Sequence, residues 1–182
     1  LQGLDKPILD SLGIDKNKPE KQQRNQTGSP ILEEGDILLN TTLAETSDWQ
    51  QVDLPVVSTL RHFCIETLSS YTEDNQACIS EVDLLDDKGQ PIDKTKWEVV
   101  YVSSEQADKN LGVAENLFDG DISSFWHTDP ATEPGQPHRI IVDIKEIYKI
   151  SALRFKVRKG AFLSGKVKEI NVYGRPQFFL FH

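Results

Sequence analysis

Short apolar or alternating runs, separated by polar turns, make up most of the chain from Asp36 onward. No stretch keeps the 3.6-residue apolar period of a long amphipathic helix, whereas a period of two is typical of half-buried strands. About nine short strands therefore predict an all-β fold, an antiparallel β-sandwich or jelly roll. The expected strands are residues 37–43, 49–54, 60–68, 77–85, 97–102, 125–128, 139–144, 150–157 and 167–173.

The ends of the chain differ from this pattern. Residues 1–35 are rich in Lys, Asp, Asn, Gln and Pro, which predicts a linker or tail with little regular structure. We expect one sandwich domain over residues 36–175. Residues 176–182 are expected to form a tail or an edge strand.

Composition limits the function classes. The net charge of −9 argues against a nucleic-acid partner, and no apolar run approaches the length of about 18 residues that a membrane span needs. The chain begins at Leu1 and contains no methionine, so we expect a processed or excised piece of a longer protein.

The charges are unevenly distributed along the chain. Residues 57–138 carry 16 acidic and 5 basic side chains, while residues 139–182 carry 10 basic and 3 acidic ones. Two explanations are open. Strands from the two regions lie side by side and neutralise one another, or the bases form a functional patch around Arg154, Lys156, Arg158 and Lys159.

Cys64 and Cys78 are the only cysteines, and each lies in an apolar, strand-like run. Antiparallel pairing of those runs would bring the two within disulfide range, but two buried thiols are an equal alternative. No nearby histidine or further cysteine completes a tetrahedral metal set with this pair.

The run from Ala114 to Thr128, AENLFDGDISSFWHT, holds the most distinctive chemistry. Asp119 and Asp121 flank a glycine that can adopt positive φ, and Ser124 adds a hydroxyl three residues later. Such a loop presents hard oxygen ligands, which suit calcium rather than zinc. The alternative is an Asx-type turn that needs no metal. Trp126, at the start of an apolar run, is expected in the core.

This run resembles the AxNxxDGDxxSxWxT signature of the discoidin superfamily, also called coagulation factor V/VIII type C domains. The strands that follow also resemble that galactose-binding-like family, which includes family 32 carbohydrate-binding modules. They are Pro137–Ile144, Ile150–Arg158 and Gly165–Gly174.

The order of the strands differs from that family. Runs similar to its last strands, Leu60–Glu66 and Ile79–Leu85, here precede the Asp-Gly-Asp loop. The chain is therefore interpreted as a circularly permuted discoidin sandwich. The alternative is the end of one domain joined to the start of a second.

The resemblance implies a structural calcium ion. Its ligands would be the side chain of Asp119, the carbonyl groups of Asn116 and Asp121, the hydroxyl of Ser124, and Glu81 from a terminal strand of the family pattern. The match of Glu81 depends on the permutation.

The resemblance also implies a sugar site on loops at one end of the sandwich. The best matches are His127, Arg158 and His138, with Asn110 before the motif and Phe162 at a loop tip as further candidates. The two histidines have an alternative role as satisfied hydrogen-bonding groups, and Phe162 has one as a packing side chain.

We therefore expect a non-catalytic carbohydrate-binding module, for a galactose-type or related sugar, beside neighbouring domains of a parent protein. The chain has no nucleophile elbow, no metalloprotease pair and no glycine-rich phosphate loop. The rival hypothesis is a protein–protein or structural interface module, for which an apolar patch at Phe178–Phe181 would be the signal.

Overall fold

The computed structural model describes residues 24, 26, 28–158 and 165–182. Within that part of the chain, the strands are β1 (Pro30–Ile31), β2 (Ile37–Thr42), β3 (Gln50–Thr67), β4 (Cys78–Asp86), β5 (Glu98–Val102), β6 (Trp126–His127), β7 (His138–Val157), β8 (Glu169–Arg175) and β9 (Leu180–Phe181). Three short 3-10 helices, η1 (Glu34–Asp36), η2 (Asp108–Asn110) and η3 (Ala114–Phe118), connect them. The predicted antiparallel β-sandwich is confirmed.

Strands β3 and β7 are each longer than predicted, because each joins two expected strands into one. The pairing of β3 with β7 shifts register between Asp53 and Ser58 and again between Leu60 and His62. Pro55, which cannot donate a ladder hydrogen bond, lies within the first irregular segment. Such bulges bend a strand without ending it, so polar or proline-containing segments that look like turns in the sequence are corners of continuous strands.

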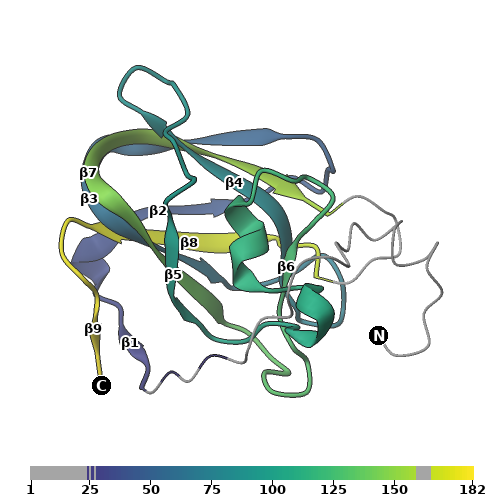
Figure 1. Ribbon diagram of the computed structural model, residues 1–182. Helices are drawn as coiled ribbons and strands as arrows, with labels where there is room; N and C mark the ends of the chain where they lie inside the picture. Colours follow the sequence, from purple (N-terminus) through teal and green to yellow (C-terminus); the bar gives the residue numbers. More distant parts are fainter. Residues whose placement is uncertain (1–23, 25, 27, 159–164) are drawn as a thin grey trace.

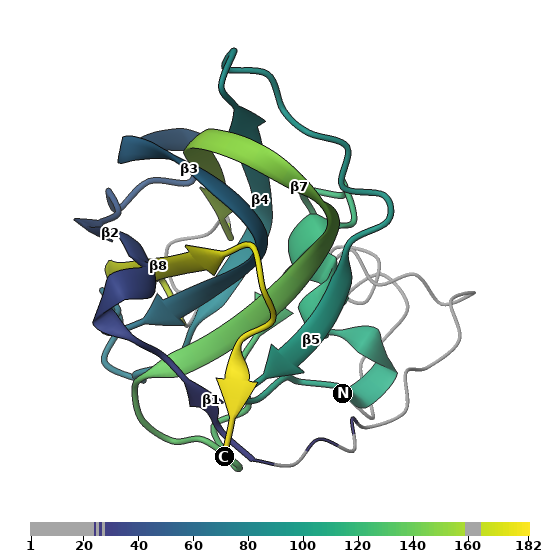
Figure 2. The ribbon, with the colours of Figure 1, turned by 90° about the vertical axis from the view of Figure 1, so that its left-hand side faces the viewer.

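These two bent strands contribute to both layers of the sandwich (Figures 1 and 2). Residues 62–67 of β3 and 138–143 of β7 pair with each other, with β8 beside β3 and β5 beside β7, and β2 extends this layer. Residues 50–53 and 152–155 of the same strands pair again in the other layer, where β4 and then β6 follow.

The main core lies between the layers and contains the expected tryptophan. Trp126 is fully buried and donates a hydrogen bond from Nε1 to the carbonyl oxygen of Ser104 at 3.1 Å. Trp97 packs edge-on against Phe63, with ring centroids 5.5 Å apart, and against Phe118 at 5.6 Å. The prediction of a core position for Trp126 is confirmed.

Strands from both sides of the Asp-Gly-Asp loop belong to the same sheet. β3 pairs with β7 and β8, and β4 pairs with β6 and β7. This pairing contradicts the alternative of two incomplete domains. A strand order permuted relative to the family stays a prediction.

The uneven charges meet across these strand pairs. Glu66 of β3 lies opposite Arg139 of β7, with a 2.7 Å ion pair, and Glu81 of β4 lies opposite Lys156. Neutralisation between neighbouring strands therefore explains much of the asymmetry.

Cys64 and Cys78 are free, buried thiols. Their strands do not pair with each other, because β7 lies between β3 and β4. Burial raises the pKa of the Cys78 thiol to about 12, which makes it a poor nucleophile.

A second, smaller apolar cluster lies on the outer face of the β3–β7–β8 layer. It comprises Cys64, Ile141, Tyr173 and Phe179, and the short β1–β9 pair lies nearby. The neighbouring side chains of Phe178, Leu180 and Phe181 are exposed. Among the described residues, no helix is long and apolar enough to cross a membrane.

His62 lies beside this second cluster and is only 1% exposed. Its ring packs on Phe178, with centroids 4.2 Å apart, and its Nε2 lies 3.6 Å from Asp143 Oδ1. Burial lowers the pKa of His62 below its ordinary value of 6.5, although the negative charge of Asp143 opposes that shift.

Stability should therefore depend on pH through His62. As pH falls through 6.5, the unfolded chain binds a proton at His62 that the folded protein does not bind, so acidification costs folding stability. We expect wild type to lose more free energy of unfolding than His62→Phe between about pH 7 and pH 5. Urea denaturation of both proteins across this range measures the difference. Burial raises the pKa of Glu81, which acts in the opposite sense, but this residue is present in both proteins. Equal losses of free energy of unfolding in the two proteins would contradict the prediction.

Candidate functional site

The Asp-Gly-Asp loop, residues 119–124, joins η3 to β6. Its start is fixed because Leu117 and Phe118 of η3 are buried in the core, and its end is fixed by the buried Phe125. Gly120 has φ of +80°, a left-handed conformation that favours glycine. The sequence thus produces a tight, exposed loop held at both ends.

Hydrogen bonds within the loop orient several of its oxygens. Asp119 Oδ1 accepts from the backbone N–H of Asp121 at 2.9 Å, and Ser124 Oγ donates to Asp119 Oδ2 at 2.5 Å. Ser124 Oγ also lies 3.0 Å from the carbonyl oxygen of Asp121. Asp121 Oδ1 is used separately, as an acceptor for the N–H and hydroxyl of Ser123. The Asx-type turns that were the alternative to a metal-binding loop are therefore present.

Glu81 of β4 comes to the same loop from a distant part of the chain. A register shift between Ile79 and Glu81 turns the Glu81 carboxylate away from the core, while Val82 and Leu84 face inward. Both carboxylate oxygens lie 3.2 Å from the backbone nitrogen of Gly120. The resemblance that selected Glu81 thus identified a residue that contacts the loop.

The Glu81 carboxylate is nearly inaccessible to solvent, with 2% of the side chain exposed. Burial raises its pKa to about 7, while ion pairing with Lys94 opposes that increase. The Lys94 ammonium also lies 2.6 Å from Asp83 Oδ1. Nothing in the sequence singled out Lys94, which lies in the polar loop between β4 and β5.

The oxygens gathered here suit a hard cation. The loop contributes the Asp119 carboxylate, the Asp121 carbonyl and the Ser124 hydroxyl, and Glu81 adds a second carboxylate from β4. Calcium prefers such oxygens. Among the described residues, no cluster of three or more His, Cys, Asp or Glu side chains fit to hold a metal occurs. Calcium here would depend on hydroxyl and carbonyl ligands as well.

Three of the residues predicted to bind sugar, Arg158, His127 and Asn110, are linked through Phe125. The half-buried Arg158 guanidinium lies over the Phe125 ring, 4.1 Å from its centroid, and Phe125 packs edge-on against His127 at 6.4 Å. His127 is 4% exposed, and its Nδ1 lies 2.6 Å from the carbonyl oxygen of Thr128. Burial lowers the pKa of His127. Because a carbonyl oxygen only accepts, the contact with Thr128 places the proton of the neutral ring on Nδ1, and Nε2 is then an acceptor.

Asn110 joins this cluster through Asn116. The buried Asn116 side chain donates to the carbonyl oxygens of Asn110 and Phe125, each at 3.1 Å, and so ties the loop before the motif to the start of β6. The backbone of Gly112 lies against His127, since a Cβ on that glycine would be 2.9 Å from the His127 Cβ. The sequence suggested a carbonyl ligand at Asn116 but did not indicate this role of its side chain.

The other two residues predicted to bind sugar, His138 and Phe162, are not part of this cluster as the structure describes it. His138 is fully buried, with Nδ1 paired to Glu133 and Nε2 2.6 Å from the carbonyl oxygen of Asn75. This geometry favours the hydrogen-bonding role for His138. Phe162 lies outside the described residues.

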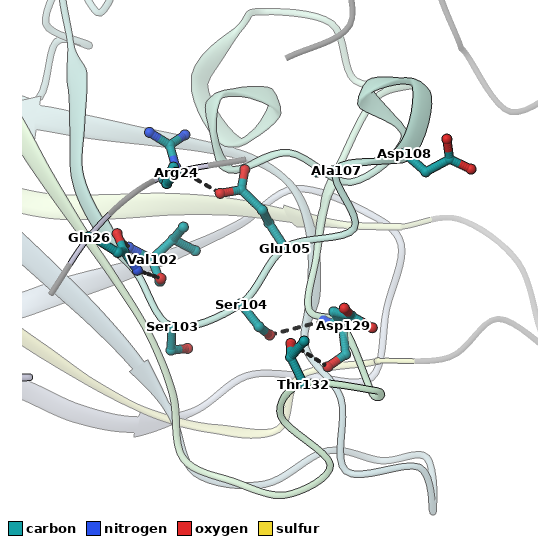
Figure 3. A pocket seen from close by; sticks show the side chains of 10 residues that line it. All are labelled: Arg24, Gln26, Val102, Ser103, Ser104, Glu105, Ala107, Asp108, Asp129 and Thr132. Carbon is teal, nitrogen blue, oxygen red and sulfur yellow. Dashed lines mark hydrogen bonds and ion pairs between the residues drawn. The ribbon is translucent and has the colours of Figure 1, made fainter. Parts of the chain in front are cut away.

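A polar pocket of about 370 Å³ lies beside the same loops (Figure 3). Arg24 reaches it from the N-terminal segment and pairs with Glu105 at 2.7 Å, while Ser104 Oγ accepts from the Asp129 backbone N–H. The sequence did not indicate these residues, because the pocket forms where three separated segments meet. Its lining is Arg24, Gln26, Val102, Ser103, Ser104, Glu105, Ala107, Asp108, Asp129 and Thr132.

Comparison with known proteins identifies a domain family to which part of this sandwich is similar. Residues 99–177 match the family model of the F5/8 type C (discoidin) domain. The predicted resemblance is confirmed.

A relative among known proteins is a sialidase from Micromonospora viridifaciens. It is 33% identical over 84 residues, which are 45% of this chain and 13% of that protein. The chain therefore corresponds to a small part of this relative's length.

Proposed function

We propose that the chain is a carbohydrate-binding module of a larger secreted or cell-surface protein, and that it binds a galactose-type or related sugar. The observation that carries the proposal is the convergence of Arg158, His127 and Asn110 at one end of an F5/8 type C sandwich. The similarity to a sialidase, an enzyme named for a sugar, supports this ligand class.

Each group has a role in this proposal. The Arg158 guanidinium donates paired hydrogen bonds to neighbouring sugar hydroxyls, and Phe125 beneath it fixes the plane of the fork. Neutral His127 accepts a hydrogen bond from a sugar hydroxyl at Nε2, and Asn110 contributes amide hydrogen bonds. His138, which is fully buried, bonds to Glu133 and to the Asn75 backbone and is not given a sugar contact.

A calcium ion at the Asp-Gly-Asp loop is part of the same proposal. Glu81, Asp119, Ser124 and the Asp121 carbonyl would hold it, with the Asn116 carbonyl as a further ligand. The ion would supply positive charge to a loop that contains two aspartates, and so tie β4 to the segment that carries Phe125. Its role is structural, since the residues proposed for sugar contact are different ones.

Titration calorimetry with galactose and lactose, on wild type and on Arg158→Ala, tests the sugar site. We expect Arg158→Ala to weaken binding at least about tenfold, because a charge-assisted, paired hydrogen bond is lost. Arg154→Ala is the matched control: Arg154 lies four residues earlier and stacks on Trp49 at 4.8 Å, so its loss should leave affinity unchanged. Equal effects of the two substitutions would contradict the assignment of Arg158.

A second candidate function rests on the exposed apolar side chains of Phe178, Leu180 and Phe181. They favour an interface module that packs on a neighbouring domain and binds no sugar. A folded protein that is silent on a broad glycan array would support this alternative over the first.

A further inference from the structure

Lys94 occupies the position of a built-in cation next to the proposed calcium loop. Its Nζ contacts the Glu81 carboxylate, lies 2.6 Å from Asp83 Oδ1, and donates to the carbonyl oxygen of Val82 at 3.2 Å. An ammonium has three N–H donors, and these three acceptors match them in number. The Lys94 side chain is only 18% exposed, so this is a largely desolvated contact.

The arrangement follows from the shape of β4. After the register shift at Glu81, alternation places Glu81 and Asp83 on the outward side of the strand while Val82 and Leu84 enter the core. Two like charges two residues apart on one face repel each other. Lys94, which lies in the loop that follows β4, pairs with both carboxylates and so reduces their repulsion.

Glu81 is thus shared between two partners. On one side it meets Lys94, and on the other its two oxygens meet the Gly120 backbone nitrogen at 3.2 Å. A calcium ion bound by Glu81 and the Asp-Gly-Asp loop would lie close to the Lys94 ammonium. At short range, and away from bulk water, two cations on one carboxylate repel strongly.

We propose that Lys94 competes with calcium for Glu81 and sets the calcium affinity of the loop. Without calcium, the ammonium keeps Glu81 paired and the loop closed on β4; calcium binds by displacing that ammonium. This inference rests on the proposed calcium site, but it concerns a residue that the calcium ligands do not include.

Calorimetric titration with calcium chloride alone, after removal of metals, tests the competition. Lys94→Met keeps an unbranched side chain one atom shorter and removes its charge, so we expect it to bind calcium at least about tenfold more tightly than wild type. Lys94→Arg keeps the charge and should remain weak. The control Lys96→Met removes an exposed charge from the same loop and should change affinity less than about twofold.

The outcomes are distinguishable. Equal calcium affinity in wild type, Lys94→Met and Lys94→Arg would overturn the competition and leave the calcium site intact. Absence of calcium binding in every protein would overturn both. If Lys94→Met does not fold without calcium, Lys94→Gln provides the same comparison, and NMR shifts of the Lys94 side chain in wild type report displacement directly. Unchanged shifts at saturating calcium would also overturn the inference.

Discussion

Trp126→Ala lowers the free energy of unfolding by about 3–5 kcal/mol, the usual cost of replacing a buried tryptophan by alanine. Trp126 is fully buried between the layers, and its Nε1 donates to the Ser104 carbonyl. The substitution therefore removes apolar contacts, leaves a cavity and deprives a buried carbonyl of its partner. A domain of this size has about 5–15 kcal/mol to lose, so a large share of its stability is at stake.

Equilibrium urea denaturation measures the loss, and Trp49→Ala is the matched control. Trp49 is half-buried and stacks under the Arg154 guanidinium at 4.8 Å on the outside of the sandwich. Its removal should cost less than about 1.5 kcal/mol, the scale of a surface cation–π contact with modest burial. Similar losses in the two variants would mean that the core is not centred on Trp126.

The strands were predictable because their apolar periodicity is local, whereas their joining was not. Residues 49–54 and 60–68 each alternate as a strand should, and the structure has strand at both. Between them, Pro55 and two exposed valines resemble a loop. Pairing with β7 over a long distance in sequence keeps this segment extended and converts it into a corner.

Parts of the candidate site were predictable for a similar reason. The loop that contains Asp119 and Ser124 is one contiguous motif, and its internal hydrogen bonds form as its residue types suggest. Glu81 is distant in the sequence and could be selected only through the family resemblance. Lys94 has no motif at all, because a lysine in a polar loop looks like an ordinary solvated charge.

The arrangement of the sugar-facing cluster also needed the fold. Arg158 directly follows β7 and His127 ends β6, and their meeting at Phe125 depends on β4 lying between those strands. The Asn116 side chain was overlooked because its short motif suggests a carbonyl ligand, while its amide in fact clamps Asn110 to Phe125. A side chain that only holds other residues in place, as Asn116 does, belongs to no sequence motif that would reveal this role.

Gly165→Ala should also be strongly destabilising, because two separate costs add. Gly165 has φ of +77°, where an alanine loses about 1–2 kcal/mol. In addition, a Cβ there would lie 2.8 Å from the backbone nitrogen of Cys78 and 2.9 Å from its Cβ, and such overpacking costs about 1–3 kcal/mol. The neighbour cannot move freely, because Cys78 donates its backbone N–H to the Gly165 carbonyl at 2.8 Å and is paired with His127 in the sheet.

Gly89→Ala separates these two costs. Gly89 has the same φ of +77°, but a Cβ there meets nothing within 4 Å, so only the conformational loss of about 1–2 kcal/mol applies. The difference between the two denaturation curves therefore measures the close packing of Gly165 on β4. Because Cys78 lies directly opposite His127, Gly165→Ala should also weaken sugar binding while Gly89→Ala does not. Equal losses of stability at the two glycines would show that the contact with Cys78 is loose, and would remove this support from the placement of His127.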